Sequence, residues 1–438
     1  MKKTLLLLLL ILSFQLKAQW SSFGDSIRDG YMIGFESYKD QLLIYGLPQN
    51  YFYEWDGTDW QKFSPSLPST TSGIHHAKVI DTILYVAPYA RSGTNHLYFM
   101  HNGTWDSLPG TFRNAGSAYS PSLYNISAFQ GNIYVCGSFN RVDNIVANAV
   151  AMWDGTKWSA LGSGLETSIS PYGSSAHGMA IYNDQLILAG DFRTAGGIAA
   201  SGIAAWDGNK WSPFGQGFKN SALGVCAYRN ELYACGEFEG SDTTALGFFG
   251  KWNGKAWVNP GFGFYGTNAY VHSLKVIDDV LYIAGNYNQM YDGKVEYHKC
   301  HSICRYNGQK VDTLDGGLNG PCEGIYKYKD KILIGGQFTY AGKIKTNHVA
   351  QLDAPIPSRI LGLKKENLRI YPTLCENFLK VENKTGVKLN YILTSVEGRR
   401  IQEGIVENQI EVVALSSGLY IISVFSEGIS YQGKFIKK

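Results

Sequence analysis

The sequence has little charge, and the charge it has is balanced. Charged residues make up 17% of the 438 residues, and the formal net charge is +3. Lys2, Lys3 and Lys17 lie in residues 1–19 without an acidic neighbour, so they account for the whole excess and the rest of the chain is neutral. A neutral chain does not favour binding to nucleic acid or to an anionic membrane surface, and neither is expected as a partner.

Long apolar runs are absent apart from one at the N-terminus. The run from Leu5 to Leu12 follows a basic start and precedes a small residue, Ala18. It is shorter than a bilayer span requires, and this order of features is typical of an export signal. We therefore expect residues 1–18 to be a signal peptide; a membrane anchor is the alternative. The mature chain is expected to lack a transmembrane segment and to lie outside the cytoplasm.

Common catalytic and metal-binding motifs are also missing. There is no Ser-His-Asp order, phosphate loop or HExxH pattern. His298, Cys300, His301 and Cys304 have ligand chemistry, but strand alternation would send Cys300 and His301 to opposite faces, and C-x3-C is not a usual zinc spacing. We expect no metal and no cofactor. The seven cysteines leave at least one unpaired within the chain, and their disulfide state stays open.

The sequence is rich in repeats instead. A Trp-Asp/Asn-Gly element recurs, with a degenerate last copy, starting at Trp55, His101, Trp153, Trp206, Trp252, Tyr306 and Gln351. An apolar hairpin-like element precedes each copy, at residues 38–46, 79–87, 129–137, 182–190, 228–236, 277–285 and 328–336. The mean period of about 49 residues is typical of one propeller blade.

Each repeat predicts four short antiparallel strands. In WDGTKW we expect a two-residue type I′ turn at Asp154-Gly155 that pairs Trp153 with Thr156 and places Trp158 on the diagonal. The copy HNGTW, at residues 101–105, is one residue shorter, so we expect it to pair differently.

The repeats predict an all-β fold, a seven-bladed β-propeller over residues 19–353. The seventh copy lacks a fourth strand, while QWSSFGDSI at 19–27 matches KWSALGSGL at 157–165. We therefore expect Trp20–Gly24 to supply the outer strand of the last blade and close the ring. An open β-solenoid is the alternative.

The repeat pattern G-x-F-x-x-A-G-G…A-x-W-D-G-x-x-W-x-x-x-G-x-G, seen from Gly190 to Gly217, resembles kelch-type and galactose-oxidase-type propellers. This resemblance implies the fold and says almost nothing about activity. No local motif matches the copper ligands of galactose oxidase, so that chemistry is not implied.

The chain after Asp353 loses the repeat. Residues 354–366 read as a linker, and 367–438 as a small Ig-like β-sandwich. This segment resembles the C-terminal sorting domain of the type IX secretion system. The matching motif residues are Tyr371, Pro372, Gly398, Gly418, Tyr420, Lys437 and Lys438. The resemblance implies the secretion machinery as a partner and a cell-surface or extracellular location; an unrelated accessory domain is the alternative.

Candidate site residues follow from aligning the innermost strands. One equivalent position holds Ile33, Ile74, Tyr124, His177, Leu223, His272 and Glu323, and the next holds Gly34, His75, Asn125, Gly178, Gly224, Ser273 and Gly324. Glycine suits a crowded channel wall, so the polar exceptions are the candidates. These are His75, Tyr124, Asn125, His177, His272 and Glu323. The alternative is that they only fill a wet channel mouth.

Three functions remain open: a monomeric binding module for a glycan or a protein, a carbohydrate-active enzyme, and a purely structural surface component. An enzyme should bring two carboxylates, or a His and a carboxylate, together at the mouth. A binder should show an aromatic surface on its variable loops. The candidates for that surface are Tyr119, Tyr172, Phe262, Phe264, Tyr265, Tyr270 and Tyr291.

Overall fold

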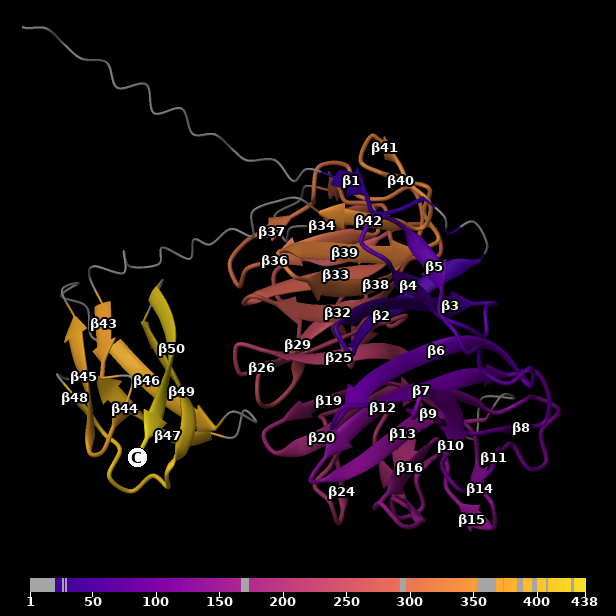
Figure 1. Cartoon of the computed structure of the whole chain (residues 1–438), viewed down its shortest axis with the longest axis horizontal. Helices are drawn as coiled ribbons and strands as arrows, with labels where there is room; N and C mark the ends of the chain where they lie inside the picture. The colour runs from indigo at the N-terminus through magenta and orange to yellow at the C-terminus, as the bar shows by residue number, and fades with distance from the viewer. Residues whose placement is uncertain are drawn as a thin grey trace, which may run out of the picture. The chain divides into compact units, whose positions relative to one another are not determined.

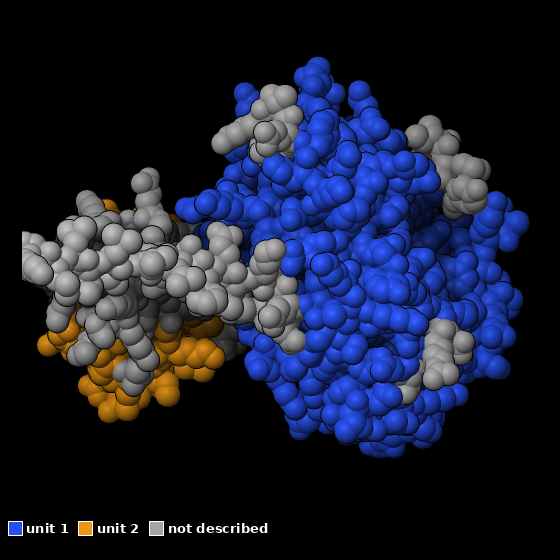
Figure 2. Space-filling view, turned by 90° about the horizontal axis from the view of Figure 1, so that it is seen from above, with its two compact units in different colours: residues 1–354 blue, residues 355–438 orange. Residues whose placement is uncertain are grey.

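The computed structural model describes residues 20–25, 27, 30–166, 173–291, 297–352, 368–372, 374–383, 389–395, 400–406, 409–426 and 429–438. The expected signal peptide (1–18) and linker (354–366) lie outside them. The chain divides into two compact units, residues 1–354 and 355–438 (Figure 2). Every regular element in the described ranges is a β-strand (Figure 1). Over the same ranges, no helix is long and apolar enough to cross a membrane.

Within the described residues, the larger unit contains seven sets of four antiparallel strands, two of which are joined in one eight-stranded sheet. The innermost strands are β2 (Tyr31–Tyr38), β6 (Thr71–Ile80), β12 (Ser122–Phe129), β19 (Ser175–Tyr182), β25 (Ala222–Tyr228), β32 (Tyr270–Ile277) and β38 (Cys322–Tyr328). The second strands are β3 (Gln41–Leu47), β7 (Ile83–Ala90), β13 (Asn132–Ser138), β20 (Gln185–Asp191), β26 (Glu231–Gly236), β33 (Val280–Asn286) and β39 (Lys331–Gly336).

The outer half of each set is shorter. The third strands are β4 (Tyr53–Trp55), β9 (Tyr98–His101), β16 (Val150–Trp153), β23 (Ile203–Trp206), β29 (Phe249–Trp252), β36 (Ile303–Tyr306) and β42 (Val349–Leu352). The outermost are β5 (Trp60–Lys62), β10 (Thr104–Ser107), β17 (Trp158–Ala160), β24 (Trp211–Pro213), β30 (Trp257–Val258), β37 (Val311–Asp312) and β1 (Trp20–Ser22). Consecutive innermost strands contact one another, and β38 contacts β2, so the sheets form a closed, propeller-like ring.

The last sheet is completed by the N-terminal strand. β1 pairs antiparallel with β42, with Trp20 opposite Leu352. The buried Trp20 ring donates a hydrogen bond from Nε1 to the carbonyl oxygen of Leu314 at 2.9 Å. Chain ends more than 300 residues apart are therefore held in one sheet, which leaves it without an open edge at β42.

Apolar clusters between facing sheets form the core of the ring. One such cluster joins Ile187 and Ala189 of β20 to Leu232 and Ala234 of β26, all fully buried. The second strands read as continuous apolar runs because both of their faces are covered by neighbouring sheets.

The prediction for the Trp-Asp-Gly turn was wrong in register. Trp153 lies directly opposite Trp158, so four residues form the connection. The reason is the Asp154 carboxylate, which accepts hydrogen bonds from the main-chain N–H groups of Thr156 (2.8 Å) and Lys157 (2.9 Å) and so stabilises a wider turn. A hydrogen bond from the Thr156 hydroxyl, followed by these two main-chain bonds, holds the pKa of Asp154 down at about 2.

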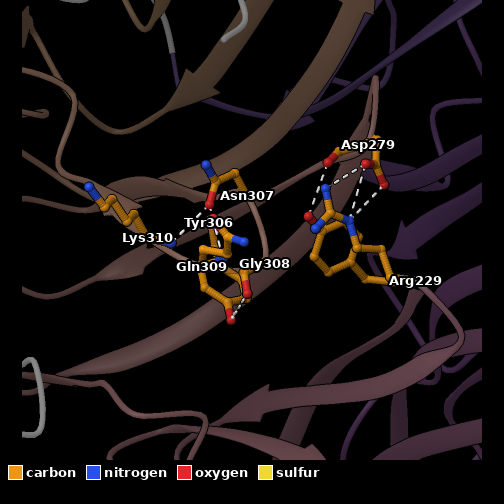
Figure 3. A network of polar contacts seen from close by, with 8 residues as sticks. Arg229, Asp279, Tyr306, Asn307, Gly308, Gln309 and Lys310 are labelled. Carbon is orange, nitrogen blue, oxygen red and sulfur yellow. Dashed lines mark hydrogen bonds and ion pairs between the residues drawn. The ribbon is translucent and has the colours of Figure 1, made fainter. Parts of the chain in front are cut away.

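Asparagine makes the same turn where aspartate is absent. Figure 3 shows Asn307 with Gln309 and Lys310, whose N–H groups donate to the Asn307 side-chain oxygen. The shorter HNGTW copy differs as expected, because His101 pairs with Thr104 across a two-residue turn, Asn102-Gly103, in which both residues have positive φ.

Indole N–H groups link most sheets to the one before. The outermost Trp of a sheet donates to a carbonyl just after the outer strand of the preceding sheet. The pairs are Trp20 to Leu314, Trp60 to Phe23, Trp105 to Pro65, Trp158 to Pro109, Trp211 to Leu161 and Trp257 to Phe214. Val311 takes this position in the sixth sheet. The repeated tryptophan therefore has a structural role between sheets.

The turns between first and second strands add ion pairs. Arg229 contacts Asp279 of the next sheet, with Nη2 2.6 Å from Oδ2 (Figure 3). Both groups are partly exposed, so this pair contributes little to stability.

The smaller unit is a sandwich of two sheets. One contains β43 (Leu368–Tyr371), β45 (Phe378–Asn383) and β48 (Gln409–Glu411). The other contains β44 (Leu374–Cys375), β50 (Ile429–Lys437), β49 (Gly418–Ser426), β46 (Leu389–Ser395) and β47 (Arg400–Val406). Leu379 and Ile410 of the first sheet share a core with Leu393 and Ile422 of the second. The Ig-like assignment stays a prediction.

Candidate binding site in the central cavity

Every innermost strand of the ring carries a β-bulge at the same place. The register against the second strand slips by one residue, at Ile33, His75, Tyr124, His177, Leu223, His272 and Glu323. A bulge leaves one residue unpaired and redirects its side chain. All seven bulged residues line one central cavity of about 780 Å³.

In the second sheet, the predicted alignment of the innermost strand was wrong by one residue. It placed Ile74 at the shared position and His75 at the next, whereas the bulge falls on His75 and His76 follows it. The cause is a further bulge between Thr71 and Gly73, which inserts a residue upstream. Ile74 is fully buried.

Glycine after the bulge lets neighbouring strands approach closely. A Cβ on Gly178 would lie 3.0 Å from the Cα of Gly224, and one on Gly324 would lie 2.8 Å from the carbonyl oxygen of Ile33. Asn125 occupies this position in β12, and its Nδ2 donates to the carbonyl oxygen of His177 at 3.1 Å. Asn125, a polar residue at a position that is otherwise mostly glycine, thus links two innermost strands.

All six candidate residues line the same cavity, and three of them stack on one side of it. The Tyr124 and His177 rings are 4.7 Å apart and nearly parallel at 9°. His75 meets Tyr124 edge-on, with 4.9 Å between centroids. His177 Nε2 lies 3.0 Å from the Ser175 hydroxyl oxygen, which fixes the ring. Together they form an aromatic wall of the kind that binds sugar or ring faces.

The imidazoles of this wall are neutral at physiological pH. Burial, then the nearby His272, lowers the pKa of His75 to about 4. Burial, then His272 and His75, lowers the pKa of His177 to about 3. His75 Nε2 is buried and has no hydrogen-bond partner within the described part of the chain.

The other two candidates form an ion pair. His272 Nδ1 lies 2.9 Å from Glu323 Oε2. Burial lowers the pKa of His272, but the Glu323 charge and its hydrogen bond outweigh burial and leave the pKa raised. Burial, followed by the charge of Glu323, also raises the pKa of Tyr31, and the same two causes, joined by Glu237, raise that of Tyr270 to about 12. Both phenols are therefore hydrogen-bond donors beside a carboxylate.

Sequence reasoning missed several lining residues. His76, Lys78, Ser127, Lys275 and Tyr326 line the cavity beyond the bulged positions. All of them except His76 lie three residues after a bulged residue, so counting three residues onward from each bulge would have found them.

The predicted aromatic loop surface is only partly present. Phe262 and Phe264 are buried in a core cluster, because apolar loop residues here pack between sheets. Tyr119 is exposed, and Tyr270 lines the cavity. Tyr172 lies outside the described residues.

The cysteines of the ring and the tail are all free thiols in the structure. Within the described ranges, no cluster of three or more His, Cys, Asp or Glu residues could hold a metal ion, and the segment around Cys300 and Cys304 is no exception.

The described motif residues of the tail lie on both of its sheets, Gly418, Tyr420 and Lys437 on the larger one and Tyr371 on the smaller. Gly418 pairs with Lys437, and the Tyr420 ring stacks on Phe435 at 5.6 Å. Tyr371 ends β43 and is followed by Pro372. Gly398 lies outside the described residues.

Residues 369–438 match the family described as a secretion system C-terminal sorting domain. The tail is a type IX sorting domain. The chain is therefore exported to the cell surface or the extracellular space, and the secretion machinery is its partner. No curated protein sequence matches the chain.

Solved structures resemble the chain only distantly. The computationally designed Ika8 protein is 10% identical with a TM-score of 0.45, over 76% of this chain and 99% of that one. The extracellular domain of a putative hybrid two-component system of B. thetaiotaomicron is 9% identical with a TM-score of 0.46, over 93% of this chain and 55% of that one. YCF48 bound to D1 peptide is 10% identical with a TM-score of 0.43, over 78% and 98%.

Proposed function

We propose that the exported chain is a binding protein whose central cavity receives a glycan. The observation that carries this proposal is the convergence of seven bulged residues on one cavity of about 780 Å³. That volume is within the usual range for small-ligand sites, and a concave wall suits a small ligand better than a flat protein partner. The kelch or galactose-oxidase type of the ring stays a prediction.

The chemistry of the wall supports a hydroxyl-rich ligand. The stacked Tyr124 and His177 rings offer an apolar face for a sugar ring. Neutral His75 and the phenols of Tyr31 and Tyr270 can exchange hydrogen bonds with sugar hydroxyls.

A glycan array probed with the purified chain tests this proposal. We expect defined glycans to bind and Tyr124→Leu to reduce their binding at least tenfold. Binding that survives both Tyr124→Leu and His177→Asn would place the ligand elsewhere and overturn the proposal.

One observation favours an enzyme as a second candidate. His272 and Glu323 meet the condition that a His and a carboxylate converge in the cavity. A general acid–base pair would require the Glu323 carboxylate for turnover. Incubation of an array-identified glycan with the wild type and with Glu323→Gln therefore separates the two functions. An enzyme hydrolyses the glycan and loses this activity in the variant, whereas a binding protein releases no product in either form.

A further inference from the structure

Three residues beyond the bulges lies a second ring of equivalent positions, four of which, Lys78, Ser127, Lys275 and Tyr326, also line the cavity. The equivalent residues are Glu36, Lys78, Ser127, Ala180, Cys226, Lys275 and Tyr326. All innermost strands run in the same direction, and a strand rises about 3.3 Å per residue, so this ring lies about 10 Å further along the channel.

Lys78 and Lys275 are the cations of this ring. They lie on β6 and β32, which belong to the second and sixth sheets. Both side chains are open to the interior of the cavity, while the surrounding sheets bury the position of Lys275. Neither forms an ion pair with a carboxylate among the described residues. The lysine–carboxylate ion pairs that the described part of the ring does contain, such as Lys251 with Glu231, lie outside the cavity.

The two lysines repel each other in the free protein. Burial, then Lys78, lowers the pKa of Lys275, and only then does Glu36 oppose the shift. Burial also raises the pKa of Glu36, and the charge of Lys78 acts against that shift. Next to them, His76 Nδ1 is buried without a hydrogen-bond partner within the described residues. Two lysines that line the cavity, opposed by a single carboxylate, that of Glu36, make this part of the cavity suited to an anion.

We propose that Lys78 and Lys275 form a subsite for an anionic group of the glycan, so that the cavity selects acidic over neutral saccharides. This inference rests on the proposed function. One sugar ring lies on the Tyr124 wall, and the anionic group of another residue of the same glycan lies about 10 Å along the channel, at the two lysines. A carboxylate and a sulfate share the required chemistry.

Calorimetric titration with three trisaccharides tests the subsite: one of galacturonic acid, one of sulfated galactose and one of neutral galactose. The variant is Lys78→Gln/Lys275→Gln. The matched control is Lys210→Gln/Lys310→Gln, which removes the same charge from two exposed outer turns.

We expect the wild type to bind an acidic trisaccharide at least tenfold more tightly than the neutral one. The Lys78/Lys275 variant should lose this preference, and the control should keep it. The preferred acidic probe identifies the carboxylate or the sulfate as the group bound. Because the lysines repel each other, the double variant should melt at the same or a higher temperature, which a structural role would not produce.

Three results would overturn the subsite. Equal affinity for acidic and neutral probes removes it and leaves the glycan site intact. An equal loss in the control variant assigns the preference to overall charge. Failure of both acidic probes to bind, while glycans identified on the array still bind, overturns the subsite and leaves the glycan proposal standing.

Discussion

The outer and inner strands of the ring share one seven-fold plan but differ in what they repeat. On the outer strands tryptophan recurs in six of the seven sheets, and its indole N–H makes the same contact to the preceding sheet. At the bulges of the inner strands the residue changes from sheet to sheet. Uniformity on the rim indicates a role in closing the ring, and variety on the inner wall indicates a role in recognition.

Removing the rim contact at the closure should have the largest effect on stability. Trp20→Ala deletes a buried ring that packs β1 and donates to Leu314. We expect a loss of about 4 kcal/mol in the free energy of unfolding, measured by urea denaturation. Ser22→Ala, on the same strand with an exposed side chain, is the control. A loss below about 1 kcal/mol would mean that β1 does not fasten the ring.

Acidification should act through the inner wall. His75 and His177 have lowered pKa values in the folded state, so unfolding lets them take up protons near their ordinary pKa. The stability associated with their neutral forms is fully present above about pH 6.5 and is lost as the pH falls toward 4. At pH 4.5 we expect each histidine to have lowered the free energy of unfolding by about 2 kcal/mol. His272, whose pKa is raised, acts in the opposite direction: its contribution is present below pH 6.5 and is lost as the pH rises.

Thermal unfolding between pH 7.5 and 4.5 measures this dependence. The variant His75→Asn/His177→Asn should show a much flatter profile than the wild type. A slope unchanged by both substitutions would assign the acid sensitivity to other groups.

A single rim hydrogen bond should have a smaller effect. Trp158→Phe removes the N–H that meets the Pro109 carbonyl, while Trp153→Phe in the same sheet changes a ring of similar burial. We expect Trp158→Phe to be the more destabilising by about 1 kcal/mol in denaturant titrations. If the two variants are equally stable, the indole contact between sheets contributes nothing.

The ring could be predicted from the sequence because its parts repeat. The match of 19–27 to 157–165 placed Trp20 on the seventh sheet, where it pairs with Leu352. Details set by one residue could not be predicted. The extra bulge before Gly73 shifts His75 into the shared position, and the Asp154 carboxylate widens a turn that dipeptide statistics assign to two residues.

The lining of the cavity was predicted in part for the same reason. In the aligned innermost strands, the bulged position precedes a position that is mostly glycine. The polar residues at these two positions were therefore chosen as candidates, and all six line the cavity. Lys78 and Lys275 were missed because they lie three residues beyond bulges that the sequence does not mark, and in the second sheet the bulged residue itself was misplaced by one.

The smallest effect on stability should come with the largest effect on binding. Tyr124→Leu removes a half-buried ring from the wall, and we expect its stability to fall by no more than about 1 kcal/mol. The decisive measurement is the dissociation constant of the best array glycan for Tyr124→Leu and Trp158→Phe, determined side by side. We predict at least tenfold weaker binding for Tyr124→Leu and wild-type affinity for Trp158→Phe. Equal affinities, or a loss confined to Trp158→Phe, would contradict the assignment of recognition to the inner wall.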